Sequence, residues 1–127
     1  MFKKFLFAIV LSSLLAFMLG GCAIVDTSTQ PAGPTVHMGG ASFLQPSITI
    51  QTGQSIALID DAASPHTITN GSWINGTAKQ AKENGAPTVL IQFNGNDSQS
   101  IGPFTASGTF HFYCTIHQNM NLTVVAQ

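Results

Sequence analysis

The sequence has 127 residues and a formal net charge of −1 at pH 7, and only 7% of its residues are charged. That length fits a single domain. It contains no Arg, and two of its four Lys lie within the first four residues. No basic surface is therefore available to neutralise phosphate groups, which argues against nucleic acid as a partner.

The N-terminus has the pattern of a bacterial lipoprotein signal. Two Lys precede a mostly apolar run over residues 5–19, which is shorter than the roughly 20 apolar residues that span a membrane as a helix. Small residues then precede Cys22, as in a lipobox, where the Cys becomes the acylated N-terminus. We predict a signal peptide over 1–21 and a lipidated Cys22 that anchors the protein outside the cytoplasm, on the periplasmic or outer face of a bacterial membrane. An ordinary signal peptide with an incidental Cys is the alternative.

Residues 22–35 are predicted to be a flexible tether. Thr, Ser, Gly and Pro recur in this stretch, and it offers little apolar surface to bury. A flexible segment of this length spans about 20 Å. The domain that follows, over residues 36–127, would therefore work close to its membrane.

From Val36 onward the pattern predicts an all-β fold. Short runs alternate apolar and polar residues, as in 47–51 and 89–93, and pairs that favour turns separate them. Alternation with a period of two at such spacing is typical of an antiparallel β-sandwich. The predicted turns lie at Thr52-Gly53, Asn70-Gly71, Asn75-Gly76, Asn84-Gly85, Asn94-Gly95 and Ser107-Gly108.

One short helix is predicted between the strands. Thr77 and Gln80 have the spacing of a capping box, in which each side chain bonds the backbone at the other position. Asn84-Gly85 can end the helix in a left-handed turn, and Pro87 prevents its continuation.

The segment from Cys114 to Met120 carries three candidate metal ligands. Phe110, Phe112 and Cys114 alternate along the chain, so they share one face of a strand. We expect the sulfur to point into the sandwich at the strand end. His117 and Met120 fall on the turn that follows, and so short a turn brings thiolate, imidazole and thioether groups around one point.

A further ligand has to come from another segment, and His66 is the best candidate. It follows Pro65, whose fixed φ restrains the loop. His37 lies near the domain start, where nothing locks it, and His111 is out of phase with Cys114 and faces away. Two His nitrogens, one Cys sulfur and a weak axial Met are the ligands of a blue-copper site, since soft sulfur favours Cu(I) and imidazole suits Cu(II).

Other roles for these residues fit less well. A disulfide between Cys22 and Cys114 competes with the lipobox for Cys22. Zinc takes the same nitrogen and thiolate ligands but rarely Met. An enzyme is not expected, because too few His remain for a second copper cluster. A nucleophile pair of Cys114 and His117 lacks an oxyanion hole, and a thiolate at a buried strand end suits a metal better than a substrate.

The segments 43–53, 64–67 and 108–117, together with Met120, resemble those of the cupredoxins in the plastocyanin and amicyanin branch. The resemblance covers roughly residues 36–127. It implies a Greek-key sandwich with one type 1 copper, bound by His66, Cys114, His117 and Met120.

Two positions depart from the cupredoxin pattern. Thr67 follows the first His ligand where many members have Asn, and Asn121 follows the Met where many have Gly. The Thr67 hydroxyl is a candidate to replace the amide of that Asn. These departures bear on how the reduction potential of the copper is tuned. They do not change the predicted set of ligands.

We expect a membrane-tethered, monomeric one-electron carrier. Redox partner proteins would dock where His117 reaches the surface, within a largely uncharged rim. Tyr113 neighbours Cys114 on the opposite side of the strand and offers a second exit for the electron. Copper binding or delivery outside the cytoplasm is the alternative. Delivery proteins often have Met-rich or His-rich runs, whereas only Met38 and Met120 follow the signal peptide.

Overall fold

The computed structural model describes residues 33–127, which form nine β-strands and no helix. This part of the chain accordingly has no helix of the length and apolar character needed to cross a membrane. The predicted signal peptide, Cys22 and most of the tether lie outside the described residues. The strands are β1 (Thr35–Met38), β2 (Ser47–Ile50), β3 (Ile56–Asp60), β4 (His66–Ile74), β5 (Thr77–Gln80), β6 (Leu90–Phe93), β7 (Ser98–Ile101), β8 (Gly108–Cys114) and β9 (Asn121–Ala126).

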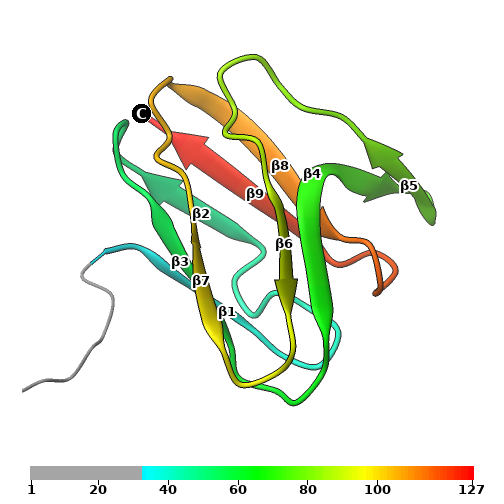
Figure 1. Ribbon diagram of the computed structural model, residues 1–127. Helices are drawn as coiled ribbons and strands as arrows, with labels where there is room; N and C mark the ends of the chain where they lie inside the picture. The colour runs from blue at the N-terminus through cyan, green and yellow to red at the C-terminus, as the bar shows by residue number, and fades with distance from the viewer. Residues whose placement is uncertain (1–32) are drawn as a thin grey trace, which may run out of the picture. The chain divides into compact units, whose positions relative to one another are not determined.

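The strands are arranged in two sheets (Figure 1). One has three strands in the order β1-β3-β7. The other has six, with β2, β9, β8 and β4 side by side and with both β5 and β6 paired to β4. Parallel pairing joins β1 to β3 and β2 to β9, and the remaining pairs are antiparallel. The arrangement confirms the predicted all-β, Greek-key sandwich.

The inward-facing side chains of β8 lie in the hydrophobic core. Phe110, Phe112 and Cys114 are each at most 1% exposed, which confirms that alternate residues of this strand point inward. Phe104, from the segment before β8, is fully buried, and its ring centroid lies 5.7 Å from that of Phe110 and 5.9 Å from that of Phe112. Aromatic pairs at such distances add to the stabilisation that comes from buried area. Rigid apolar packing therefore fixes the strand that ends in Cys114.

The predicted helix beginning at Thr77 is wrong. Residues 77–80 form β5, an exposed strand that pairs with the second half of β4. Asn75 and Gly76 both have positive φ, at 49° and 74°, which is the conformation of a two-residue hairpin turn. The Asn-Gly turn commits the following residues to strand pairing, and this pairing overrides the local capping signal.

The turn predicted at Asn70-Gly71 is also absent, because both residues lie inside β4. Gly71 has a φ of +121°, and a Cβ at this position would collide with the carbonyl oxygen of Lys79 on β5. Figure 1 shows β4 bending sharply partway along its length. Glycine is needed here because only a residue without a side chain fits both the dihedral angle and the close approach of β5.

Removal of the Phe104 ring tests the packing behind β8. We expect Phe104→Ala to lower the free energy of unfolding by about 3–5 kcal/mol, because it leaves a cavity among buried aromatic rings. The control is Leu90→Ala, since Leu90 is 73% exposed. It should change the free energy of unfolding by no more than about 0.5 kcal/mol. Urea denaturation of the metal-free protein measures both, and equal losses would contradict this view of the core.

Candidate metal centre

Three of the four predicted ligands come together at one end of the sandwich. His66 begins β4, Cys114 ends β8, and His117 lies in the loop that follows. One donor atom from each lies within 4.8 Å of the other two, and no other group of this kind occurs in residues 33–127. The Cys114 sulfur is 3.8 Å from Nδ1 of His66 and 3.6 Å from Nδ1 of His117. Both rings therefore turn the same nitrogen toward the sulfur.

Strand pairing places His66 beside Cys114. β4 and β8 are antiparallel neighbours in which Ile68 lies opposite Cys114. Beyond that pair, the N–H of Thr115 donates to the carbonyl of Thr67 at 2.8 Å. Backbone atoms make this link between the two ligand segments, so it does not depend on the Thr67 hydroxyl.

Short-range hydrogen bonds close the ligand loop. The N–H of Cys114 donates to the carbonyl of Met120 at 3.0 Å, and the N–H of Met120 donates to the carbonyl of His117 at 3.3 Å. Asn119 has a positive φ of 64°, a conformation that Asn adopts more readily than most residues. Met120 is 2% exposed, so the loop turns it inward. Its role as an axial ligand stays a prediction.

A buried carboxyl group faces the far side of the His66 ring. Nε2 of His66 lies 3.7 Å from Oδ1 of Asp60, and both side chains are fully buried. Burial lowers the pKa of His66 below its ordinary value against the opposing effect of Asp60, and His117 adds to the lowering. The imidazole is thus held neutral, which is the form that binds metals. A proton on Nε2, toward Asp60, would leave Nδ1 free to face the sulfur.

His117 occupies the boundary between the site and the surface. Its side chain is partly exposed, and its ring centroid lies 4.8 Å from that of His66, at an interplanar angle of 56°. Nδ1 faces the Cys114 sulfur, and Nε2 lies 3.4 Å from Oγ of Ser64. The Nδ1 side of this ring therefore faces the metal site, and the Nε2 side lies next to Ser64 in the neighbouring loop.

The β4–β5 hairpin braces the ligand loop, and the sequence did not reveal this. The N–H of Trp73 donates to the side-chain oxygen of Asn121 at 2.8 Å, and the Asn121 amide donates back to the Trp73 carbonyl at 3.0 Å. The indole N–H of Trp73 donates to the Cys114 carbonyl at 2.8 Å. The Gln118 amide donates to the Gly76 carbonyl at 3.1 Å. The only sequence signal was the departure at Asn121.

The two remaining histidines pair with carboxylates on the surface. Nδ1 of His37 lies 2.7 Å from Oδ2 of Asp61, and Nδ1 of His111 lies 2.6 Å from Oε1 of Glu83. All four side chains are between 33% and 47% exposed. Neither histidine joins the group of three donors.

The donor set fits copper. Two imidazole nitrogens and one sulfur converge without a carboxylate among them, and the Met120 thioether is buried in the same loop. This mixture of soft sulfur and imidazole suits both oxidation states of copper. His66, Cys114 and His117 are thus the residues that would hold the metal, with Met120 predicted as the axial ligand.

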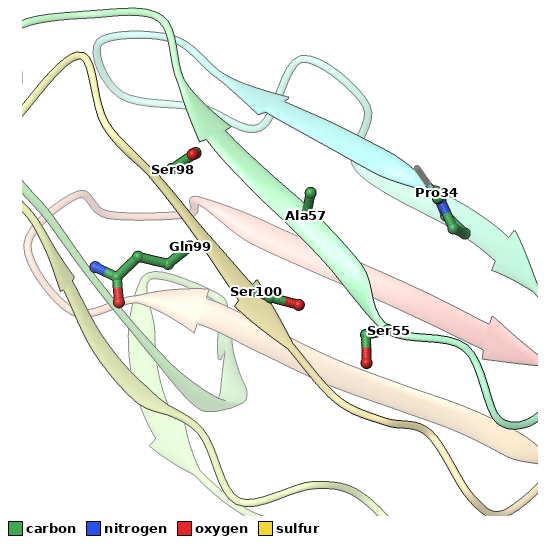
Figure 2. Close-up of a pocket in the computed structure, with 7 residues that line it drawn as sticks. Pro34, Ser55, Ala57, Ser98, Gln99 and Ser100 are labelled. Carbon is green, nitrogen blue, oxygen red and sulfur yellow. The ribbon is translucent and has the colours of Figure 1, made fainter. Parts of the chain in front are cut away.

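A shallow depression of about 330 Å³ lies elsewhere, on the three-stranded sheet. Figure 2 shows that Ser55, Ala57 and Ser100 border it. No His, Cys or Met lines it, so it is separate from the metal centre.

Comparisons with known proteins agree with this geometry. A model of copper-binding proteins of the plastocyanin/azurin family matches residues 34–127. Amicyanin from Paracoccus versutus is similar in structure, with a TM-score of 0.60 and 17% sequence identity over 79% of this chain and 86% of that one. A purple cupredoxin from Nitrosopumilus maritimus gives a TM-score of 0.58 and 16% identity over 74% and 99% of the two chains. Among curated proteins, no sequence matches the chain significantly.

Asp60 offers a test of how the buried carboxyl group acts on the centre. A negative charge behind His66 favours the more positive oxidation state of a bound metal, so Asp60→Asn should raise the reduction potential. Two charges about 8 Å apart interact by roughly 2 kcal/mol at an effective dielectric constant of about 20, which corresponds to a rise of about 50–100 mV.

The matched control is Asp61→Asn, because Asp61 is exposed and pairs with His37. Solvent screens its charge, so the potential should shift much less. Redox titration of the copper-loaded variants makes the comparison. Equal shifts in the two variants would show that the buried position of Asp60 has no special effect.

Proposed function

Because the chain belongs to the plastocyanin/azurin family of copper-binding proteins, we propose that it is a membrane-tethered blue copper protein that carries single electrons between redox partners. The convergence of the His66, Cys114 and His117 donor atoms within 4.8 Å of one another carries the proposal. Copper bound there would supply a Cu(II)/Cu(I) couple. The protein would act as a carrier rather than as an enzyme.

The residues around the donors suit electron transfer because they keep the site rigid and dry. His66 and Cys114 are fully buried, and backbone bonds fix the segments on both sides of the sulfur. A site held this firmly changes little when its charge changes by one, which keeps the barrier to electron transfer low. The same burial opposes copper delivery, since delivery requires ligands that exchange readily.

The His117 edge is the proposed docking site for redox partners. Ile116 is 52% exposed, and Pro65, Gln118 and Asn119 are also exposed. None of these side chains is charged. Docking here should be brief and only weakly steered by charge, so transfer rates at this edge should depend little on salt.

The ligand assignment predicts the colour of the copper-loaded protein. Visible absorption should be strong, because a thiolate bound to Cu(II) gives charge transfer, and Cys114→Ser should abolish it. His66→Ala should lose both colour and copper affinity, whereas the control His37→Ala should keep both. Met120→Leu should stay coloured but shift in potential, since the axial ligand tunes a blue-copper site. The assignment is wrong if His37→Ala loses the colour and His66→Ala keeps it.

The anchor can be tested separately from the copper site. Cys22 lies in a lipobox-like sequence, and stable anchoring needs more than one acyl chain, which a lipoprotein N-terminus would supply. In cell fractions the wild-type protein should sediment with membranes, and Cys22→Ala should not. The variant should still bind copper, because the tether precedes the sandwich. Recovery of all the wild-type protein in a soluble fraction without detergent would contradict lipidation.

A further inference from the structure

Asn is followed by Gly at four positions in the described part of the chain, which are Asn70, Asn75, Asn84 and Asn94. This dipeptide is the one most prone to lose ammonia, because glycine has no side chain to hinder attack by its backbone nitrogen on the Asn side chain. Folding slows the reaction wherever it bonds the amide or fixes the backbone away from the direction of attack. The structure therefore decides which of the four pairs is reactive.

Asn70 is protected by burial and by hydrogen bonds. It lies within β4 and is 5% exposed. Its side-chain N–H donates to the Pro87 carbonyl at 2.9 Å, and its side-chain oxygen accepts from the N–H of Val89 at 2.8 Å. Attack on this amide would break both bonds inside a packed sheet, so Asn70 should be inert.

Asn75 is exposed, but the β4–β5 hairpin fixes its backbone. Its φ is 49°, and strand pairing resumes at once on both sides, at Ile74 and Thr77. The carbonyl of Gly76 accepts a hydrogen bond from the Gln118 amide at 3.1 Å. Rotation of the Asn75 backbone toward its own side chain would open the hairpin, which slows the reaction.

Asn94 lies in the β6–β7 loop, which packs against the β3–β4 loop. Its N–H donates to a carboxylate oxygen of Asp97 at 3.2 Å. The backbone of Gly95 approaches Ala63 so closely that a Cβ on Gly95 would lie 2.8 Å from it. The Asp97 carboxylate also opposes the negative charge that develops as the backbone nitrogen attacks. Asn94 should therefore react slowly as well.

Asn84 and Gly85 are both exposed, in the long connection between β5 and β6 (Figure 1). The turn predicted here is present, and the Ala86 N–H closes it by donating to the Glu83 carbonyl at 3.1 Å. Gly85 has a φ of 84° and Asn84 does not have a positive φ, which is the pattern of a type II turn. Such a turn leaves Asn84 extended, and its backbone can rotate toward the side chain through allowed angles.

Lys82 places a positive charge at the same turn. Its Nζ donates to the carbonyl of Ala86, the residue after Gly85, at 3.1 Å. A nearby cation favours loss of the proton from the Gly85 N–H and stabilises the negative charge that develops during attack. The other charged group of the turn, the Glu83 carboxylate, is turned toward β8, with Oε1 2.6 Å from Nδ1 of His111.

We propose that Asn84 is a site of spontaneous deamidation, and that its conversion to isoaspartate loosens Glu83 from His111. The backbone nitrogen of Gly85 bonds to Cγ of Asn84 and gives up its proton, while the bond from Cγ to the side-chain nitrogen breaks and ammonia leaves. Water then opens the cyclic imide. Opening at Cγ gives aspartate, and opening at the main-chain carbonyl gives isoaspartate, whose backbone is one carbon longer. Water is the only co-reactant, and the reaction does not depend on the proposed electron-carrier function.

The longer backbone of isoaspartate would move Glu83, the residue before it, away from β8. Burial raises the pKa of Glu83, but the hydrogen bond from His111 and nearby backbone N–H groups outweigh burial and hold this pKa below its ordinary value. Loss of the contact should return the pKa of Glu83 toward that value. It should also weaken the hold of residues 81–86 on β8, the strand that ends in Cys114.

Peptide mass spectrometry can follow the reaction at each position. The full-length, copper-loaded protein is incubated in a mildly alkaline buffer, sampled at intervals and digested. In the native protein Asn84 should convert several-fold faster than Asn75 or Asn94, and Asn70 should stay intact. The matched control is the same chain unfolded in guanidinium chloride, where the four pairs should convert at similar rates. The comparison separates the effect of the fold from that of the dipeptide.

Two kinds of variant test the chemistry of the turn. Asn84→Gln should stop the reaction at this position, because glutamine forms the larger ring slowly, and should leave the rate at Asn75 unchanged. Lys82→Gln should slow conversion of Asn84 about twofold, as expected for one charge acting through water at about 8 Å. Lys79→Gln makes the same change in charge on β5 and should have a smaller effect.

NMR titration of the Glu83 carboxyl group measures the structural consequence. The pKa of Glu83 should be higher in the isoaspartate form than in fresh protein. Asn84→Asp adds the same charge with an ordinary backbone, so it should raise this pKa less. The deamidation site is wrong if Asn75 or Asn94 converts first in the native protein, or if Asn84 stays intact for as long as the unfolded chain needs to convert. An unchanged pKa of Glu83 in the isoaspartate form would overturn the predicted loss of the His111 contact.

Discussion

The antiparallel pairing of β4 with β8 is the constraint on which the metal centre depends. It sets Ile68 opposite Cys114, so His66, two residues earlier on the same face of β4, falls just past the end of β8 and beside the sulfur. A slip of one residue would turn the imidazole to the other face of the sheet, because strand side chains alternate. Buried residues along both strands oppose such a slip. The position of the ligands therefore follows from the register of a packed sheet and does not require the metal.

Burial of polar atoms at the metal centre lowers the stability of the fold, and a bound metal can offset this cost. Among the described residues, neither Nε2 of His66 nor Oδ2 of Asp60 has a hydrogen-bond partner, although both atoms are buried. Such groups reduce stability unless something compensates them. A cation at the three donors would fix the His66 tautomer with its proton toward Asp60 and would place positive charge near the carboxyl group. Metal binding is thus coupled to the stability of the fold.

The parts of the site that depend on local spacing could be predicted from the sequence. The Cys-x-x-His-x-x-Met pattern and the period-two alternation before it are local, and so are their structural consequences. The brace between Trp73 and Asn121 could not be predicted, because these residues lie 48 positions apart and neither is a typical metal ligand. The burial of Asp60 depends on packing between loops. The helix expected from Thr77 to the Asn84-Gly85 turn failed for a related reason, since pairing with β4 decided the conformation of a segment with a plausible local signal.

The bend in β4, the hairpin and Asn121 depend on one another. Asn121 offers one donor and one acceptor to the two backbone groups of Trp73, much as a neighbouring strand would, and a Gly at this position has no side chain with which to do so. The contact also requires β4 to turn back over the ligand loop, which it does at Gly71, where a Cβ would collide with Lys79. A strand that continued straight would carry the indole away from Cys114. The departure from the cupredoxin pattern after Met120 is therefore the local sign of a hairpin that bonds the backbone carbonyl of Cys114, the predicted thiolate ligand.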